Sequence, residues 1–228
     1  MPLFTGFSSE TFSFLAGLGY HNERSWFEEH KSEYERFVVN PALALIAEMD
    51  SVVKAISPHY RGVPKKMGGS LMRIYRDTRF SRDKTPYKTN IGIQFRHESA
   101  KDVHAPGWYV HLDLSSCFMG AGTWHPEPDD LNRLRQAIAE KPESYSRALE
   151  ETKESGMTLG GESLVKMPRG YDPAHPLAAE IQRKDFILTT DLDPALYMSH
   201  DLIEVLEVKF RATAPFMAWM CRVLGAPF

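Results

Sequence analysis

Hydrophobic residues recur every three or four positions through the first third of the chain. This spacing predicts helices over residues 7–18, 22–38 and 41–56. Asn22 is expected to cap the second helix, because its side chain can accept a hydrogen bond from the first turn. Asn40-Pro41 is expected to separate the second helix from the third, since proline suits the first helical position.

The pattern changes in the middle third, where hydrophobic and polar residues alternate over short segments. These segments are rich in aromatic and β-branched side chains, which is typical of strands. Several of the connections between them are short and contain Gly, Pro or Ser, which favours antiparallel pairing, with a tight turn at Ser115-Ser116. The expected strands cover residues 71–76, 90–96, 108–114 and 117–121.

The expected strands have one apolar face. Ile91 and Ile93 alternate with polar residues in one strand, and Val110 and Leu112 do so in the next. Residues two apart in a strand lie on the same face of its sheet. We therefore expect these four side chains to be buried against helices, on a mostly antiparallel sheet.

Helical spacing returns in the last third. Leu131, Leu134 and Ile138 share one face of an expected helix, Pro142 is expected to start another, and Ser199 to cap a long final helix. Between them we expect a loop over 156–161, strands over 164–167 and 186–190, and a short helix near 177–181.

The order of helices, then strands, then helices indicates an α+β fold. No internal repeat, low-complexity tract or clear linker divides the 228 residues, so we expect a single domain over residues 1–228. The expected architecture is a central antiparallel sheet with helices packed on one face and a polar cavity on the other.

Composition narrows the class of protein. With 43% hydrophobic and 25% charged residues, the chain is typical of a globular protein with a sizeable core. Its net charge of −3 argues against a protein that coats nucleic acid without regard to sequence. We expect Cys117 and Cys221 to be buried, reduced thiols. The absence of a long apolar run and of basic residues before the N-terminal apolar ones predicts a cytoplasmic protein with no membrane partner.

One segment departs from this average. Residues 73–88 contain six cationic and two anionic residues, a net charge of +4, interleaved with aromatic and hydroxyl side chains. Arginine can grip an oxyanion with two hydrogen bonds, and lysine adds a movable charge. The run therefore predicts a clamp for a phosphate or carboxylate. The candidate binding residues here are Arg73, Tyr75, Arg76, Arg79, Lys84 and Lys88. The alternative is an ion-paired loop that ties the sheet to acidic helices.

A second group of polar residues is expected on the face opposite the apolar one. Alternation places Tyr109, His111 and Asp113 there, with Gln94 from the neighbouring strand. Histidine can move a proton near neutral pH, and a nearby carboxylate can orient it. The sequence thus predicts Tyr109, His111 and Asp113 as catalytic candidates and Gln94 as a binding residue. The alternative is a solvated or structurally paired polar face.

Other kinds of chemistry find little support in the sequence. His111-x-Asp113 with a remote histidine could form an iron site, but the pair is a weak signal and no metal is expected. No dinucleotide fingerprint, P-loop, G-x-S-x-G or C-x-x-C motif is present. No complete catalytic signature appears, so the sequence leaves open whether the protein is an enzyme and which cofactor it uses.

Several motifs together resemble the domain-of-unknown-function 2461 family of bacterial and fungal proteins. The resemblance implies an α+β fold and no established activity. It also suggests a glutamate at the position where this chain has Asp113. The aspartate side chain is shorter, so its carboxylate reaches less far. The residues that carry it are Asn22 to Phe27, His30-Lys31, Tyr34, the run Arg73 to Lys88, Pro106 to Leu112, Pro126 to Pro128, Pro168 to Asp172 and His175-Pro176.

The leading hypothesis is therefore that the protein binds a small anionic molecule. In an extended form of this hypothesis, the protein also catalyses a reaction of that molecule. One rival is a nucleic-acid module, favoured by the basic and aromatic interleaving and disfavoured by the acidic net charge. The other rival is an interaction scaffold with no small-molecule site, in which the basic run only stabilises the fold.

Overall fold

The computed structural model describes residues 3–99 and 105–228, and its centre is one antiparallel sheet. The strand order is β1-β2-β3-β4-β6-β5, and every pair of neighbours is antiparallel. This confirms the α+β expectation. The strands are β1 Tyr60–Arg61, β2 Ile91–His97, β3 Gly107–Leu112, β4 Cys117–Thr123, β5 Thr158–Gly160 and β6 Phe186–Asp191.

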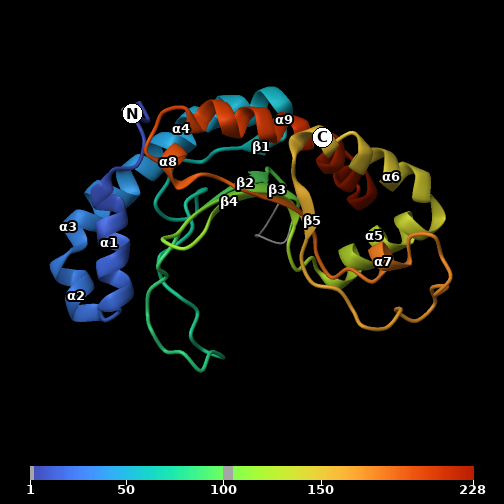
Figure 1. Ribbon diagram of the computed structural model, residues 1–228, viewed down its shortest axis with the longest axis horizontal. Helices are drawn as coiled ribbons and strands as arrows, with labels where there is room; N and C mark the ends of the chain where they lie inside the picture. The colour runs from blue at the N-terminus through green and yellow to red at the C-terminus, as the bar shows by residue number, and fades with distance from the viewer. Residues whose placement is uncertain (1–2, 100–104) are drawn as a thin grey trace.

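Helices cover one face of this sheet and both of its ends, so that the molecule has the outline of an arch (Figure 1). Helices α4 and α9 pack against each other and against the sheet at the top of the arch, with α1 to α3 at one end and α5 to α7 at the other (Figure 1). The helices are α1 Ser9–Tyr20, α2 Arg24–Glu29, α3 Lys31–Glu33, α4 Asn40–Ile56, α5 Pro128–Glu140, α6 Pro142–Glu150, α7 Ala178–Ile181, α8 Pro194–Tyr197 and α9 Leu202–Leu224, with a π-helix at Tyr34–Val39 and a 3₁₀ turn at Lys153–Ser155. Among the described residues, none of these helices combines the length and apolar character that a bilayer crossing requires.

The core lies between the sheet and helices α4 and α9. Ile91, Ile93, Val110 and Leu112 are each at most 3% exposed, which confirms the predicted buried face. Trp108 of β3 is fully buried. Its ring stacks on Phe210 of α9 at a centroid distance of 5.2 Å, and its indole N–H donates to the Thr213 hydroxyl at 3.0 Å.

The other face of the sheet carries the side chains that alternate with this core. The register pairs Gly92 with His111 and Gln94 with Tyr109 between β2 and β3, and His111 with Phe118 between β3 and β4. Tyr109, His111 and Phe118 are only partly buried. The polar character of this face matches the expectation, whereas a cavity enclosed by it remains a prediction.

Helix α4 begins at Asn40 with Pro41 in its first turn, as expected, but it continues directly from the π-helix, so Asn40-Pro41 does not separate two helices. Proline at 41 lacks the N–H that would bond the carbonyl of Phe37, four residues earlier. The hydroxyl of Thr11 donates to that carbonyl instead, at 2.6 Å. A side chain from α1 therefore satisfies the acceptor that Pro41 leaves open, and the helix runs on.

Three expected strands differ in the structure. Residues 71–76 form only isolated bridges, from Leu71 to Ile93 and from Tyr75 to Tyr87, because the segment leaves the sheet edge and pairs with its own returning chain. Residues 164–167 are not a strand, and the expected loop 156–161 contains β5, which pairs with β6. The expected strand 108–114 is shorter at its end, because β3 ends at Leu112, and Leu114 beyond it is 52% exposed.

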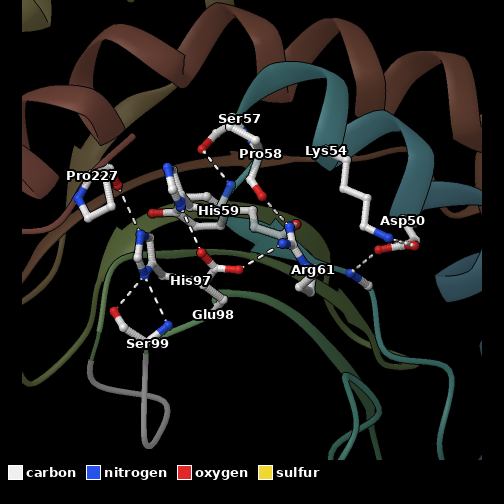
Figure 2. A network of polar contacts seen from close by, with 12 residues as sticks. Asp50, Lys54, Ser57, Pro58, His59, Arg61, His97, Glu98, Ser99 and Pro227 are labelled. Carbon is white, nitrogen blue, oxygen red and sulfur yellow. Dashed lines mark hydrogen bonds and ion pairs between the residues drawn. The ribbon is translucent and has the colours of Figure 1, made fainter.

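A polar network fastens β1 to the adjoining end of β2 (Figure 2). The Glu98 carboxylate accepts from His59 Nδ1 at 2.8 Å and from Arg61 Nη2 at 2.7 Å. His97 Nδ1 accepts from the backbone N–H of Ser99 at 3.2 Å, so its Nε2–H donates to the carbonyl of Pro227 at 2.9 Å. The network explains how a two-residue strand holds its place.

Both cysteines are free and buried, which confirms the expectation. Burial raises the pKa of each thiol. A thiol with a raised pKa is a poor nucleophile, so these residues contribute to packing.

The hydrogen bond from Trp108 to Thr213 can be tested by substitution. Thr213→Val keeps the shape of the side chain but leaves the buried indole N–H without an acceptor. We expect a loss of about 1–3 kcal/mol in the free energy of unfolding, measured by urea denaturation. Thr190→Val, at a partly exposed strand position, is the control. Equal stability of the two variants would contradict the assignment.

Candidate functional site

A groove of about 680 Å³ lies between the start of α2 and the loop that carries the basic run. On the helix side, it is lined by Asn22, Glu23, Arg24 and Glu28. On the loop side, it is lined by Tyr75, Arg76, Thr78, Lys84, Pro86 and Tyr87. Two segments about fifty residues apart in the sequence therefore meet at one surface.

The two sides of the groove are held together by Asn22. Its side-chain N–H donates to the carbonyl of Tyr87, and its side-chain oxygen accepts from the Tyr87 backbone N–H, both at 3.0 Å. The ring of Tyr87 also stacks on Phe27 of α2 at a centroid distance of 4.3 Å. Asn22 was expected to cap α2, but the residue before that helix is Glu23, and the Asn22 amide serves this tertiary contact.

The loop is ordered largely by its own charges. The Arg79 guanidinium donates to both carboxylate oxygens of Asp77, and these hydrogen bonds lower the Asp77 pKa to about 2. Asp83 accepts from the backbone N–H of Thr85 and from Arg76, which together lower its pKa to about 2. Arg76 and Arg79 therefore pair with carboxylates of the loop itself, and not with the acidic helices that the structural alternative named.

Two cations that line the groove have no such partner. Lys84 donates to the backbone carbonyl of Thr78 at 2.7 Å and forms no ion pair with a described carboxylate. Arg24 forms no hydrogen bond or ion pair with any described side chain, and its side chain is exposed. Both can accept an external anion without breaking an ion pair.

A further pair of cations lies at the base of the loop. Lys88 is half-buried, and its pKa is lowered by burial and, secondarily, by the positive charge of Arg73. Neither side chain forms an ion pair within the described part of the chain. Two like charges near each other raise the energy of the charged state, so this pair also favours a nearby anion.

On the open face of the sheet, Tyr109, His111 and Asn90 form a second cluster. The Tyr109 hydroxyl lies 2.8 Å from His111 Nδ1, and the Asn90 side-chain nitrogen lies 3.5 Å from the same atom. Burial raises the Tyr109 pKa to about 12 and lowers the His111 pKa, so the phenol is protonated and the imidazole is neutral at pH 7. The Asn90 amide nitrogen can only donate, so the arrangement fits the tautomer in which Nδ1 accepts and Nε2 carries the proton.

The Tyr109–His111 contact depends on Gly92. A Cβ atom built at Gly92 would lie 2.8 Å from the Tyr109 hydroxyl and 2.9 Å from the sulfur of Met72. The absence of a side chain thus lets the phenol lie across β2 and reach the imidazole. His111 Nε2 has no hydrogen bond to a described residue, and the imidazole ring stacks on Phe118 at 4.6 Å.

The remaining candidates lie apart from this cluster. Asp113 caps the turn after β3 by accepting from the backbone N–H and hydroxyl of Ser115, both at 2.8 Å. It acts on His111 through its charge, which raises the histidine pKa, rather than through a hydrogen bond. Gln94 is 8% exposed beside Tyr109. Within the described residues, no three His, Cys, Asp or Glu side chains are placed to hold a metal ion.

The structure thus brings Tyr75, Arg76 and Lys84 together in the groove, and Tyr109 with His111 on the sheet. Arg73, Arg79 and Lys88 are not among the groove's lining residues. Sequence reasoning did not assign Asn22, Glu23, Arg24 or Glu28 to a site. The available signal was the motif Asn22 to Phe27, which formed part of the family resemblance.

The state of His111 can be tested by NMR. We expect its imidazole to titrate below the ordinary value of 6.5. Between that lowered pKa and 6.5 the unfolded chain binds more protons than the native protein, so His111 makes native stability rise with pH in this window.

Tyr109→Phe removes a donor to the neutral ring and should raise the His111 pKa, whereas Tyr20→Phe, at an exposed position, should not. Titration above 6.5 in the wild type would contradict this assignment.

The role of Asn22 can be tested by hydrogen exchange. Asn22→Ala removes the acceptor of the Tyr87 amide, so we expect exchange at that amide to accelerate by roughly fivefold to tenfold, since one hydrogen bond contributes about 1 kcal/mol or slightly more. Ser25→Ala, an exposed change on α2, is the control. Unchanged protection of Tyr87 would show that Asn22 does not join the two segments.

Comparison with known proteins places these features in a family. The family model described as "Conserved hypothetical protein (DUF2461)" matches residues 10–219. No curated protein and no solved structure matches the chain. The matched region includes both sides of the groove and the strands that carry Tyr109 and His111. The chain belongs to the DUF2461 family.

Proposed function

We propose that the protein binds a small molecule with a phosphate or carboxylate group in the groove between α2 and the basic loop. The observation that carries this proposal is that Arg24 and Lys84 both line the groove, and neither forms an ion pair with a described carboxylate. An anion between them would receive charge-assisted hydrogen bonds. The groove also offers the hydroxyls of Tyr75 and Thr78.

The openness of the groove sets the expected strength of binding. Ion pairs in contact with water each contribute about 0–1 kcal/mol. Arg24 and Lys84 alone would therefore bind inorganic phosphate weakly. The space of about 680 Å³ admits a larger molecule, whose remaining atoms would supply further contacts. Phosphate serves as a probe for the anionic group of such a ligand.

Tyr109 and His111 do not line the groove, so a chemical step at these residues would require a ligand that extends from the groove to the open face of the sheet. The Tyr109 hydroxyl engages His111 Nδ1, which would leave Nε2 to exchange a proton with such a ligand. Asp113 would tune the histidine by charge alone.

One observation favours a second candidate function. Phe80 at the tip of the basic loop is 95% exposed, and the Arg79 guanidinium lies 5.8 Å from its ring centroid. An exposed aromatic ring among cations is typical of surfaces that stack single-stranded bases. Oligonucleotide binding that weakens steeply with salt would support this alternative.

Anion binding can be measured by thermal unfolding. Sodium phosphate should raise Tm above the value in sodium chloride at equal ionic strength, by roughly 3–6 °C at ten times Kd. Lys84→Gln and Arg24→Gln should each reduce that difference. Arg82→Gln removes an exposed cation of the same loop that does not line the groove, so it should preserve the difference. An equal loss in all three variants would indicate a diffuse charge effect and reject the groove.

A further inference from the structure

We propose that the ligand of the groove is zwitterionic, with an amine as well as a phosphate or carboxylate group. This inference rests on the proposed function and names the chemical class of its ligand. The groove contains unpaired charges of both signs, and the anionic ones come from the helix side.

The carboxylates that line the groove can contact a ligand as readily as its cations can. Glu23 forms no hydrogen bond or ion pair with a described side chain, although it lines the groove. Glu28 has only a long ion pair with Lys31, at 3.8 Å between two well-exposed side chains. Because such a pair contributes little, Glu28 can turn to a ligand at small cost.

Counting only the groups without a close ion pair, the groove is balanced. Arg76 is paired with Asp83, which leaves Arg24 and Lys84 as cations, Glu23 as an unpaired carboxylate and Glu28 as a carboxylate with only the long pair to Lys31. A ligand with only negative charge would gain from the first pair and be repelled by the second. A ligand with an added ammonium would gain from both.

Side chains of both signs line the groove together with Tyr87. Arg24 and Glu28 are four residues apart in α2, so they lie on the same face of that helix. Burial raises the Tyr87 pKa, Tyr75 and Glu28 raise it further, and Arg24 lowers it. A ligand with its two charged groups a few bonds apart could contact both.

The tyrosine rings give a second reason to expect an amine. Tyr75 is 52% exposed, and its ring centroid lies 5.5 Å from that of Tyr87. The face of an aromatic ring attracts an ammonium group. Tyr87 is buried and stacked on Phe27, so Tyr75 supplies the accessible ring face. This ring, on the loop side, and the carboxylates of the helix side favour the same kind of group.

The test compares two probes that differ only in the amine. Phosphoethanolamine and ethyl phosphate are titrated into the full chain by calorimetry at pH 7. We expect phosphoethanolamine to bind roughly fivefold to tenfold more tightly, the combined effect of exposed carboxylates and a ring face. The carboxylate pair β-alanine and propionate should show the same order.

Substitutions then test the amine-binding and the anion-binding residues of the groove separately. Glu28→Gln should remove most of the preference for phosphoethanolamine while leaving ethyl phosphate binding unchanged or slightly stronger. Glu29→Gln, an exposed change on the same helix that does not line the groove, should leave the preference intact. Lys84→Gln should weaken both probes. Circular dichroism checks that each variant is folded.

The outcomes distinguish this inference from the function on which it rests. Equal binding of the two phosphate probes overturns the zwitterion and leaves an anion site. Failure of both probes to bind overturns the groove function and, with it, this inference. A preference that survives Glu28→Gln and Glu23→Gln also overturns it, because the amine would then be recognised elsewhere.

Discussion

The packing of Trp108 against α9 fixes which residues of β3 face outward. The indole is fully buried, stacked on Phe210 and hydrogen-bonded to Thr213. Because strand side chains alternate, a buried Trp108 requires Tyr109 and His111 on the opposite face. A shift of one residue would bury both polar rings against α9 and expose the tryptophan. The polar face therefore follows from a constraint in the core, and it would exist whether or not it serves a function.

The groove depends on a different constraint, the pairing of the Asn22 amide with the backbone of Tyr87. The segment around Tyr87 has left the sheet and pairs only with its own returning chain, through the bridge to Tyr75. A backbone in this position needs outside partners for its polar groups. Asn22 supplies both, and the stack of Phe27 on Tyr87 adds apolar contact. The helix side and the loop side are thereby held at a fixed spacing.

Sequence reasoning succeeded where one periodic pattern decides the structure. Alternation at Ile91 and Val110 predicted the buried face, and helical spacing located the long helices. It failed where tertiary partners override a local signal. Nothing near Pro41 reveals that the hydroxyl of Thr11 will satisfy the Phe37 carbonyl. Likewise, Asn22 has the local signature of a cap, and its partner is sixty-five residues away. The cations of the basic run were visible in the sequence, but the groove's helix side could not be found by local spacing.

The net charge of a segment is a poor guide to the charge of the surface that it builds. Residues 73–88 carry +4 in sequence, a sum that already includes Asp77 and Asp83, and these two pair with Arg79 and Arg76 inside the loop. Helix α2 then adds Glu23 and Glu28 to the same groove. What remains is a surface with separate positive and negative positions rather than a broad positive field. Such a surface selects ligands by the placement of their charges, since a uniform field would attract any anion. The loop's internal ion pairs therefore do more than order it, because they engage Arg76 and Arg79 and leave the other cations of the run to contact an anion.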